Sequence, residues 1–196
     1  WENIAATIEA PPDQRGGLYE TALTAISCLE SEAVARYVTP PSTWTNAPRI
    51  NRIDEFDPWS FVVGGQGQRG DTFYMLTREG AGTGAPIVAA LVDHLLRVTA
   101  MAATARGGRI DPPVRAVLDE AANICPIRNL PDLYSYFGSM SIQVMTFLQS
   151  YGQGVAVWGR SGMDKLWSAA TIKLVGAGVH DPEVCEHVSR LIGDHD

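Results

Sequence analysis

The segment Val-Arg-Ala-Val-Leu-Asp-Glu, at residues 114–120, constrains the fold of this chain more than any other. It is an apolar run, interrupted only by Arg115, that ends in two adjacent carboxylates, Asp119 and Glu120. A short run rich in aliphatic residues is typical of a strand buried in a parallel sheet. Open α/β sheets bind ligands at the carboxyl ends of such strands, where the two acids would lie. The segment therefore predicts an α/β fold with a polar site at this sheet edge.

The two acids resemble the Walker B motif of nucleotide-hydrolysing motors. In that arrangement Asp119 would hold Mg²⁺ through its water shell, and Glu120 would polarise the attacking water. A strand that ends in Asp-Glu can also be a solvated turn or the start of a helix. The motif alone leaves both alternatives open.

A second apolar segment, residues 142–150, follows about thirty residues later and also ends in polar groups. In RecA-like motors the strand beside Walker B ends in a polar sensor of the γ-phosphate, and Gln149 has the reach for that role. Residues 171–176 are predicted to form the next strand, and residues 72–77 an earlier one. The first two strands would bring Asp119, Glu120 and Gln149 to one site.

Five motifs follow one another along the chain: residues 70–77, residues 114–120, Leu148-Gln149-Ser150 with Gln153 and Gly159, residues 169–176, and residues 187–193. In this order they resemble the TraG/TraD coupling proteins of conjugation and type IV secretion, over roughly residues 50–193. The resemblance implies a membrane-anchored homo-hexameric ATPase at the cytoplasmic face of the bacterial inner membrane. Its cofactors would be ATP and Mg²⁺. Its partners would be relaxase-bound DNA or effector proteins, which it would deliver to the secretion channel.

The resemblance also implies a domain organisation. Coupling proteins have a RecA-like, mainly parallel sheet flanked by helices and interrupted by a helical insert. Residues 1–46 resemble the end of that insert, and residues 47–196 resemble the C-terminal part of the motor domain. Three prolines within residues 39–48 mark the exit from the helical part.

No Walker A motif is present in the sequence. The nearest match, from Gly65 to Thr72, places Asp71 where the phosphate-binding loop has lysine. The charge of Asp71 would repel the β- and γ-phosphates. Without a phosphate cradle the chain alone is predicted not to hydrolyse ATP. In coupling proteins this loop precedes the helical insert, so an N-terminal truncation would account for its absence.

An arginine finger is a further expectation of the resemblance. Many family members carry a basic residue around positions 138–140, and this sequence has none there. Arg160, between Gly159 and Gly162, is the preferred substitute. An exposed loop charge with no catalytic role is the alternative interpretation of this residue.

Charge and composition bear on which ligands, cellular compartment and membrane association are expected for this chain. The net charge of −7 argues against a large nucleic-acid surface on this piece. Three widely spaced cysteines indicate a reducing compartment and no metal site. By this interpretation no apolar stretch approaches the ~20 residues needed to cross a bilayer, so the fragment is expected to be soluble. A non-catalytic module whose residues 1–46 recruit relaxase or effector remains the alternative function.

Periodicity predicts helices over residues 2–10, 17–37 and 85–106, with a short helix over residues 163–170. Residues 53–63 are expected to be a docking segment or a short strand. Asp181, followed by Pro182, is predicted to cap a final helix.

Overall fold

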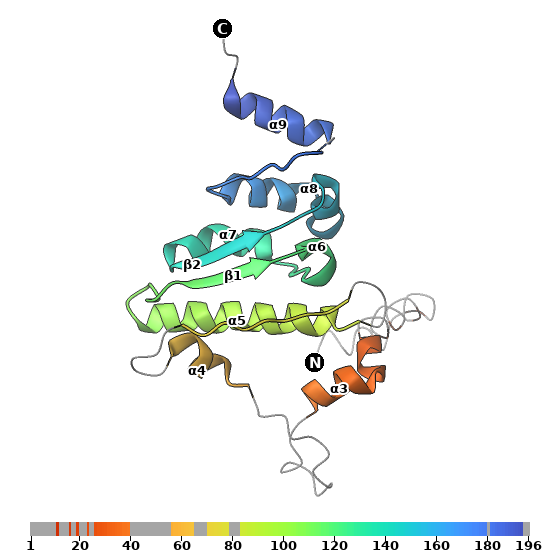
Figure 1. The fold of residues 1–196 in the computed structure, drawn as a ribbon, viewed down its shortest axis with the longest axis vertical. Coiled ribbons are helices and arrows are strands. Elements are labelled where there is room, and N and C mark those ends of the chain that lie inside the picture. Colours follow the sequence, from red (N-terminus) through yellow and green to blue (C-terminus); the bar gives the residue numbers. More distant parts are fainter. Residues whose placement is uncertain are drawn as a thin grey trace, which may run out of the picture. The chain divides into compact units, whose positions relative to one another are not determined.

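The computed structural model describes residues 11, 16, 19, 23, 26–39, 56–64, 70–78, 83–179 and 181–193 (Figure 1). The chain divides into two compact units. One comprises residues 1–56 and 75–88, and the other comprises residues 57–74 and 89–196. The predicted helix over residues 2–10 and the predicted domain boundary between residues 46 and 47 lie outside the described residues.

The larger unit is built on a pair of parallel strands, β1 (Val114–Leu118) and β2 (Ile142–Thr146). Val114 pairs with Ile142 and Leu118 with Thr146. Both strands were predicted from the sequence, and both are confirmed. Within the described residues the sheet has these two strands, so the observed class is mixed α/β with a small parallel sheet.

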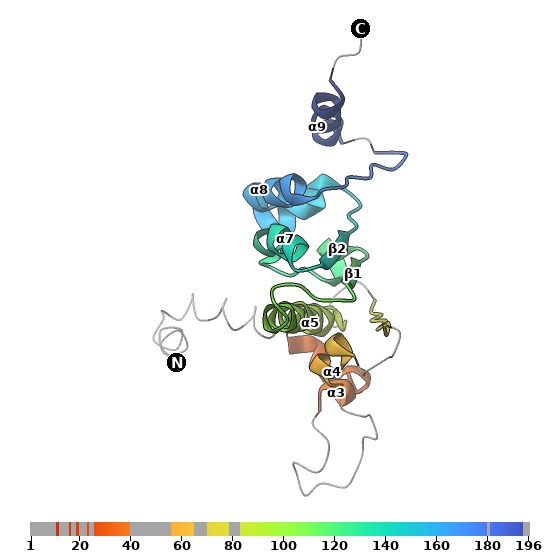
Figure 2. The same cartoon turned by 90° about the vertical axis from the view of Figure 1, so that its left-hand side faces the viewer.

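The connection from β1 to β2 contains two helices, α6 (Ala121–Ile124) and α7 (Leu130–Ser139). Leu130 and Phe137 of α7 are almost completely buried. The hydroxyl of Tyr134 donates a hydrogen bond to the backbone oxygen of Val144 over 3.0 Å. This contact joins α7 to β2, which lies beside it in the ribbon (Figure 2). This connection is a helical crossover of the kind that parallel strands require.

Helix α5 (Ala85–Ala105) precedes β1 and confirms the predicted helix over residues 85–106. It is followed by Gly107 and Gly108, which have φ of 84° and 101°. Glycine adopts such values without steric cost, so the chain can leave the helix abruptly toward β1.

By length and composition alone, α5 could cross a membrane, since its 21 residues have a mean hydropathy of 1.5 over the most apolar window. The expectation that no apolar stretch approaches this length is therefore wrong. The helix is also partly buried and carries an ion pair. Leu96 and Ala103 are buried, and Asp93 pairs with Arg97 over 2.8 Å.

Two helices follow β2. Helix α8 (Tyr151–Ala169) includes the predicted short helix over residues 163–170 and is interrupted at Gly159, where φ is 70°. The indole N–H of Trp158 in α8 donates to the backbone oxygen of Ile127 over 2.8 Å, which fixes the helix against the loop before α7. Helix α9 (Pro182–Ile192) begins after Asp181, whose carboxylate accepts from the backbone N–H groups of Glu183 and Val184. The predicted cap is confirmed.

Three predicted segments differ from the structure. Residues 171–176 and 72–77 are not strands, and side chains such as Leu76 and Leu174 are largely exposed. Apolar residues favour a strand only when a neighbouring strand supplies hydrogen bonds, and neither segment has such a neighbour among the described residues. The described end of the segment at 53–63 contains helix α4 (Pro58–Val63) rather than a strand, because Asp57 caps it and Pro58 suits its first turn.

In the smaller unit, the described part of the predicted helix over residues 17–37 is divided at Ser31. A 3₁₀ helix, η1 (Ser27–Glu30), precedes this residue and α3 (Glu32–Val38) follows it. Ser31 has φ of −76° and ψ of 116°. These extended angles end one helix and begin the next.

Candidate functional site

The candidate site lies at the carboxyl ends of β1 and β2, where the two segments that follow these strands leave the sheet side by side. Phe147 N–H donates to Leu118 O over 3.0 Å, and Ala121 N–H donates to Phe147 O over 3.1 Å. These bonds extend the pairing beyond the strands themselves. They hold Glu120, just after β1, close to Gln149, just after β2.

Glu120 has an unusual backbone conformation, with φ of 51° and ψ of 44°. This is the left-handed region, which residues other than glycine seldom occupy and which costs of order 1–3 kcal/mol. The turn redirects the chain from β1 into α6, for which Glu120 is the N-cap. Such conformations persist where the surrounding structure enforces them, and they concentrate at functional sites.

Both carboxylate oxygens of Glu120 accept hydrogen bonds from amide groups. Nε2 of Gln149 donates to Oε1 over 2.8 Å, and Nδ2 of Asn123 lies 3.5 Å from Oε2. The structure therefore brings together Glu120 and Gln149, which sequence reasoning had selected from separate motifs. Asn123 was missed. The available signal was its position three residues after Glu120, at the start of a helix, where side chains three apart face each other.

Asp119 is exposed and makes no hydrogen bond or ion pair within the part of the chain that the structure describes. Its oxygens are hard ligands, and Mg²⁺ usually keeps most of its waters while contacting one or two carboxylates and the substrate phosphates. An exposed, unpartnered carboxylate beside Glu120 fits that mode of binding. The described residues contain no group of three or more His, Cys, Asp and Glu side chains that could hold a metal ion.

Gln149 is itself held by the first turn of α8. Its backbone N–H donates to Oε1 of Gln153 over 3.1 Å, and Nε2 of Gln153 lies 3.5 Å from Oε1 of Gln149. Ser150 caps the helix by accepting from Gln153 N–H over 3.2 Å. The polar side chains at this edge thus form a connected series from α8 to Glu120.

Arg160 lies elsewhere on α8, one residue beyond the interruption at Gly159. Its guanidinium makes a two-pronged ion pair with Glu183 of α9, in which Nη2 and Oε2 are 3.1 Å apart. The hydrogen bond to Glu183 and its charge raise the pKa of Arg160 above its ordinary value. The predicted glycine-flanked turn is therefore a kink within a helix, and a role as arginine finger stays a prediction.

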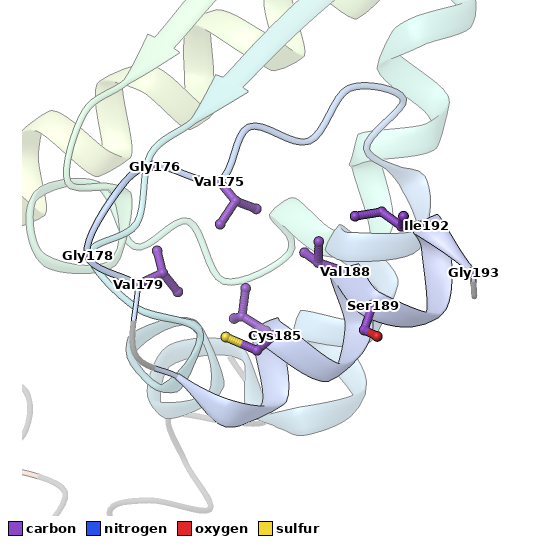
Figure 3. Close-up of a pocket in the computed structure, with 10 residues that line it drawn as sticks. Val175, Gly176, Gly178, Val179, Cys185, Val188, Ser189, Ile192 and Gly193 are labelled. Carbon is purple, nitrogen blue, oxygen red and sulfur yellow. The ribbon is translucent and has the colours of Figure 1, made fainter. Parts of the chain in front are cut away.

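A shallow apolar cavity of about 430 Å³ lies between α9 and the segment that precedes it. Val175 and Val179 line it from the segment, and Val188 and Ile192 line it from the helix (Figure 3). Sequence reasoning did not select this surface. The available signal was the four-residue spacing of Val184, Val188 and Ile192, which places apolar side chains on one face of a helix.

Comparison with known proteins identifies the C-terminal part of the chain. Residues 113–196 match the family model described as the TraM recognition site of TraD and TraG. The match is to the C-terminal region of a TraG/TraD-type coupling protein. No curated protein and no solved structure matches the chain.

The matched coupling-protein region contains every site residue selected from the sequence: Asp119, Glu120, Gln149 and Arg160. It includes both strands of the sheet and the apolar cavity at α9. The recognition of the family from its motifs is confirmed. The motif at residues 70–77 precedes the matched region.

Proposed function

We propose that this chain supplies the Walker B and sensor portion of a coupling ATPase of conjugation or type IV secretion. The observation that carries the proposal is the 2.8 Å hydrogen bond between Gln149 and Glu120. It joins two polar residues at the ends of adjacent parallel strands, which is where open α/β sheets act on their ligands. The β1–β2 pair is then part of a larger RecA-like, mainly parallel sheet.

Each residue has a distinct task in this proposal. Asp119 holds the water shell of the Mg²⁺ that accompanies ATP, and Glu120 accepts a hydrogen bond from the attacking water and aligns it. Gln149 donates one amide proton to Glu120 and the other to the γ-phosphate. A phosphate-binding loop from another part of the coupling protein cradles the nucleotide, because the present sequence has no lysine-bearing loop.

The partners follow from the family. The description of the matched model supports a relaxosome-type partner recognised through residues 113–196. The coupling protein then delivers relaxase-bound DNA or protein effectors to the secretion channel as a homo-hexamer at the cytoplasmic face of the bacterial inner membrane. Because this chain has a net charge of −7, most contacts with the phosphate backbone of DNA are made by other parts of the assembly.

The test is Glu120→Gln in the coupling protein that carries this segment together with its phosphate-binding loop. Hydrolysis should fall about 10²-fold or more, the scale on which a general base contributes. ATP affinity and hexamer assembly should be retained. Glu186→Gln on α9 is the matched control and should leave turnover unchanged. Near-normal hydrolysis by Glu120→Gln at equal nucleotide occupancy would refute the assignment.

Recruitment without catalysis is the second candidate function, and the apolar cavity at α9 favours it. The sequence placed recruitment in residues 1–46, most of which lie outside the described part of the chain. The cavity instead presents Val188 and Ile192 to an apolar side chain of a TraM-type partner. Val188→Asp should weaken binding of that partner in a calorimetric titration, with α9 shown to be folded by circular dichroism. Unchanged affinity would exclude this surface.

A further inference from the structure

We propose that Gln153 is a positioning residue that orients the side-chain amide of Gln149 toward Glu120. The proposal rests on the proposed function, because it concerns the same site. It assigns a task to a residue on α8 whose link to Glu120, among the described residues, runs through Gln149. The geometry that points to this task is a pair of contacts made by a single side chain.

Gln153 contacts Gln149 at two places. Its Oε1 accepts from the backbone N–H of Gln149 over 3.1 Å, which fixes where the main chain leaves β2. Its Nε2 lies 3.5 Å from Oε1 of Gln149, the acceptor end of that side chain. The donor end of the same amide, Nε2, lies 2.8 Å from Glu120.

The orientation of the Gln149 amide decides whether it can bind Glu120. An ionised carboxylate only accepts hydrogen bonds, whereas a glutamine amide has a donor end and an acceptor end. If the amide were reversed, its carbonyl oxygen would face the Glu120 oxygens and repel them. A donor placed against the carbonyl of Gln149 favours the productive orientation, and Gln153 supplies that donor.

A purely structural role for Gln153 makes a different prediction. Ser150 and Gln153 have the Ser-x-x-Gln spacing of a capping box, in which the fourth residue stabilises the helix start. Glutamate serves equally well in a capping box. Gln153→Glu therefore keeps the capping acceptor but lacks the donor for the Gln149 carbonyl. Its carboxylate would also attract the donor end of Gln149 away from Glu120.

The experiment measures the contact directly in the 196-residue chain. In NMR spectra, the side-chain amide signals of Gln149 should shift when Glu120 is replaced by glutamine. In a Gln153→Glu background, the same Glu120→Gln replacement should leave those signals unmoved, while the thermal midpoint of unfolding stays that of the parent. Gln143→Glu is the matched control, since Gln143 is exposed on β2 and its side chain contacts Arg115. In that background the shift should persist.

A second variant and a second measurement complete the test. Gln153→Ala, which removes both contacts, should also abolish the response. In the coupling protein, Gln153→Glu should lower kcat about 10-fold or more with ATP affinity retained, because misplaced catalytic groups cost rate rather than binding. Persistence of the Gln149 response in both Gln153 variants would overturn the proposal. Loss of the response, with hydrolysis insensitive to Glu120→Gln, would support the positioning and refute the ATPase function.

Discussion

Two glycines in the first turn of α8 provide a sharp test of the packing that supports the candidate site. A Cβ atom added at Gly154 would lie 2.4 Å from Sδ of Met163 and 3.3 Å from Cδ1 of Leu148. A Cβ atom added at Gly152 would have only Ser150 Oγ nearby, at 3.8 Å. The same substitution to alanine, two residues apart in one helix, should therefore have unequal effects on stability.

The magnitudes follow from two opposing contributions. Alanine in place of glycine stabilises a helix by up to ~1 kcal/mol, and both variants gain this. Gly154→Ala also overpacks a buried contact, since Met163 is only 6% exposed, and overpacking costs about 1–3 kcal/mol. Gly152→Ala should thus be about 0.5–1 kcal/mol more stable than the parent. The variant Gly154→Ala should be ~1–3 kcal/mol less stable than Gly152→Ala. The gain in helix propensity is common to both variants, so this difference measures the overpacked contact with Met163.

Urea denaturation of the 196-residue chain, followed by circular dichroism, measures both free energies of unfolding. Shortening the side chain that is overpacked should rescue the defect, so Gly154→Ala should cost less in a Met163→Ala background than alone. Equal stabilisation by the two alanines would refute the close approach of Gly154 to Met163. An additive double variant would refute the assignment of the cost to the thioether.

Two further predictions concern Arg160 and Cys125. In the assembled coupling protein, Arg160→Ala should slow hydrolysis by ~10³-fold if the residue acts as an arginine finger, and mixing with Glu120→Gln subunits should restore part of the activity; unaltered turnover would assign Arg160 to its ion pair with Glu183 alone. Burial, with a smaller contribution from Asp93, raises the pKa of the Cys125 thiol from 9.0 to about 11. The unfolded thiol ionises first as pH rises, so Cys125 should contribute a loss of about 2–3 kcal/mol in unfolding free energy between the two pKa values. Comparison with Cys125→Ala by denaturation at pH 8 and pH 11 measures this, and parallel pH profiles would contradict it.

The sequence predicted the secondary-structure elements that are determined by patterns within a few neighbouring residues. The strand at 114–118 and the cap at Asp181 are examples, because apolar patterning and capping chemistry act over one or two turns. The pairing of Glu120 with Gln149 was also foreseeable, since adjacent parallel strands end at one edge. Residues 171–176 show the limit of this reasoning. Their alternating pattern favours a strand, but a strand forms only when a neighbour supplies backbone hydrogen bonds, and the sequence of the segment does not specify that neighbour.

The contacts of individual side chains were the other feature that the sequence did not predict. The sequence placed Arg160 in a glycine-flanked turn, but its partner Glu183 lies 23 residues further on and is brought close only by the arrangement of α8 and α9. Asn123 and Gln153 are polar residues without a distinctive motif of their own. Their contacts with Glu120 and Gln149 depend on left-handed backbone at Glu120 and on the bend after β2, which composition and periodicity do not report.

The hydroxyl of Tyr134 has a consequence for the growth of the sheet. Ser141 and Phe147, which flank β2, bond to β1. Backbone groups alternate in direction along a strand, so the oxygen of Val144 faces the opposite edge. The phenol already occupies that oxygen and also lies 3.3 Å from Thr146 Oγ1. A strand that joins this edge would donate a backbone N–H to the same oxygen, which can accept two hydrogen bonds, so the phenol would share that oxygen or leave it. Tyr134 is thus a native reporter of sheet completion, because another strand at this edge would alter the surroundings of its hydroxyl.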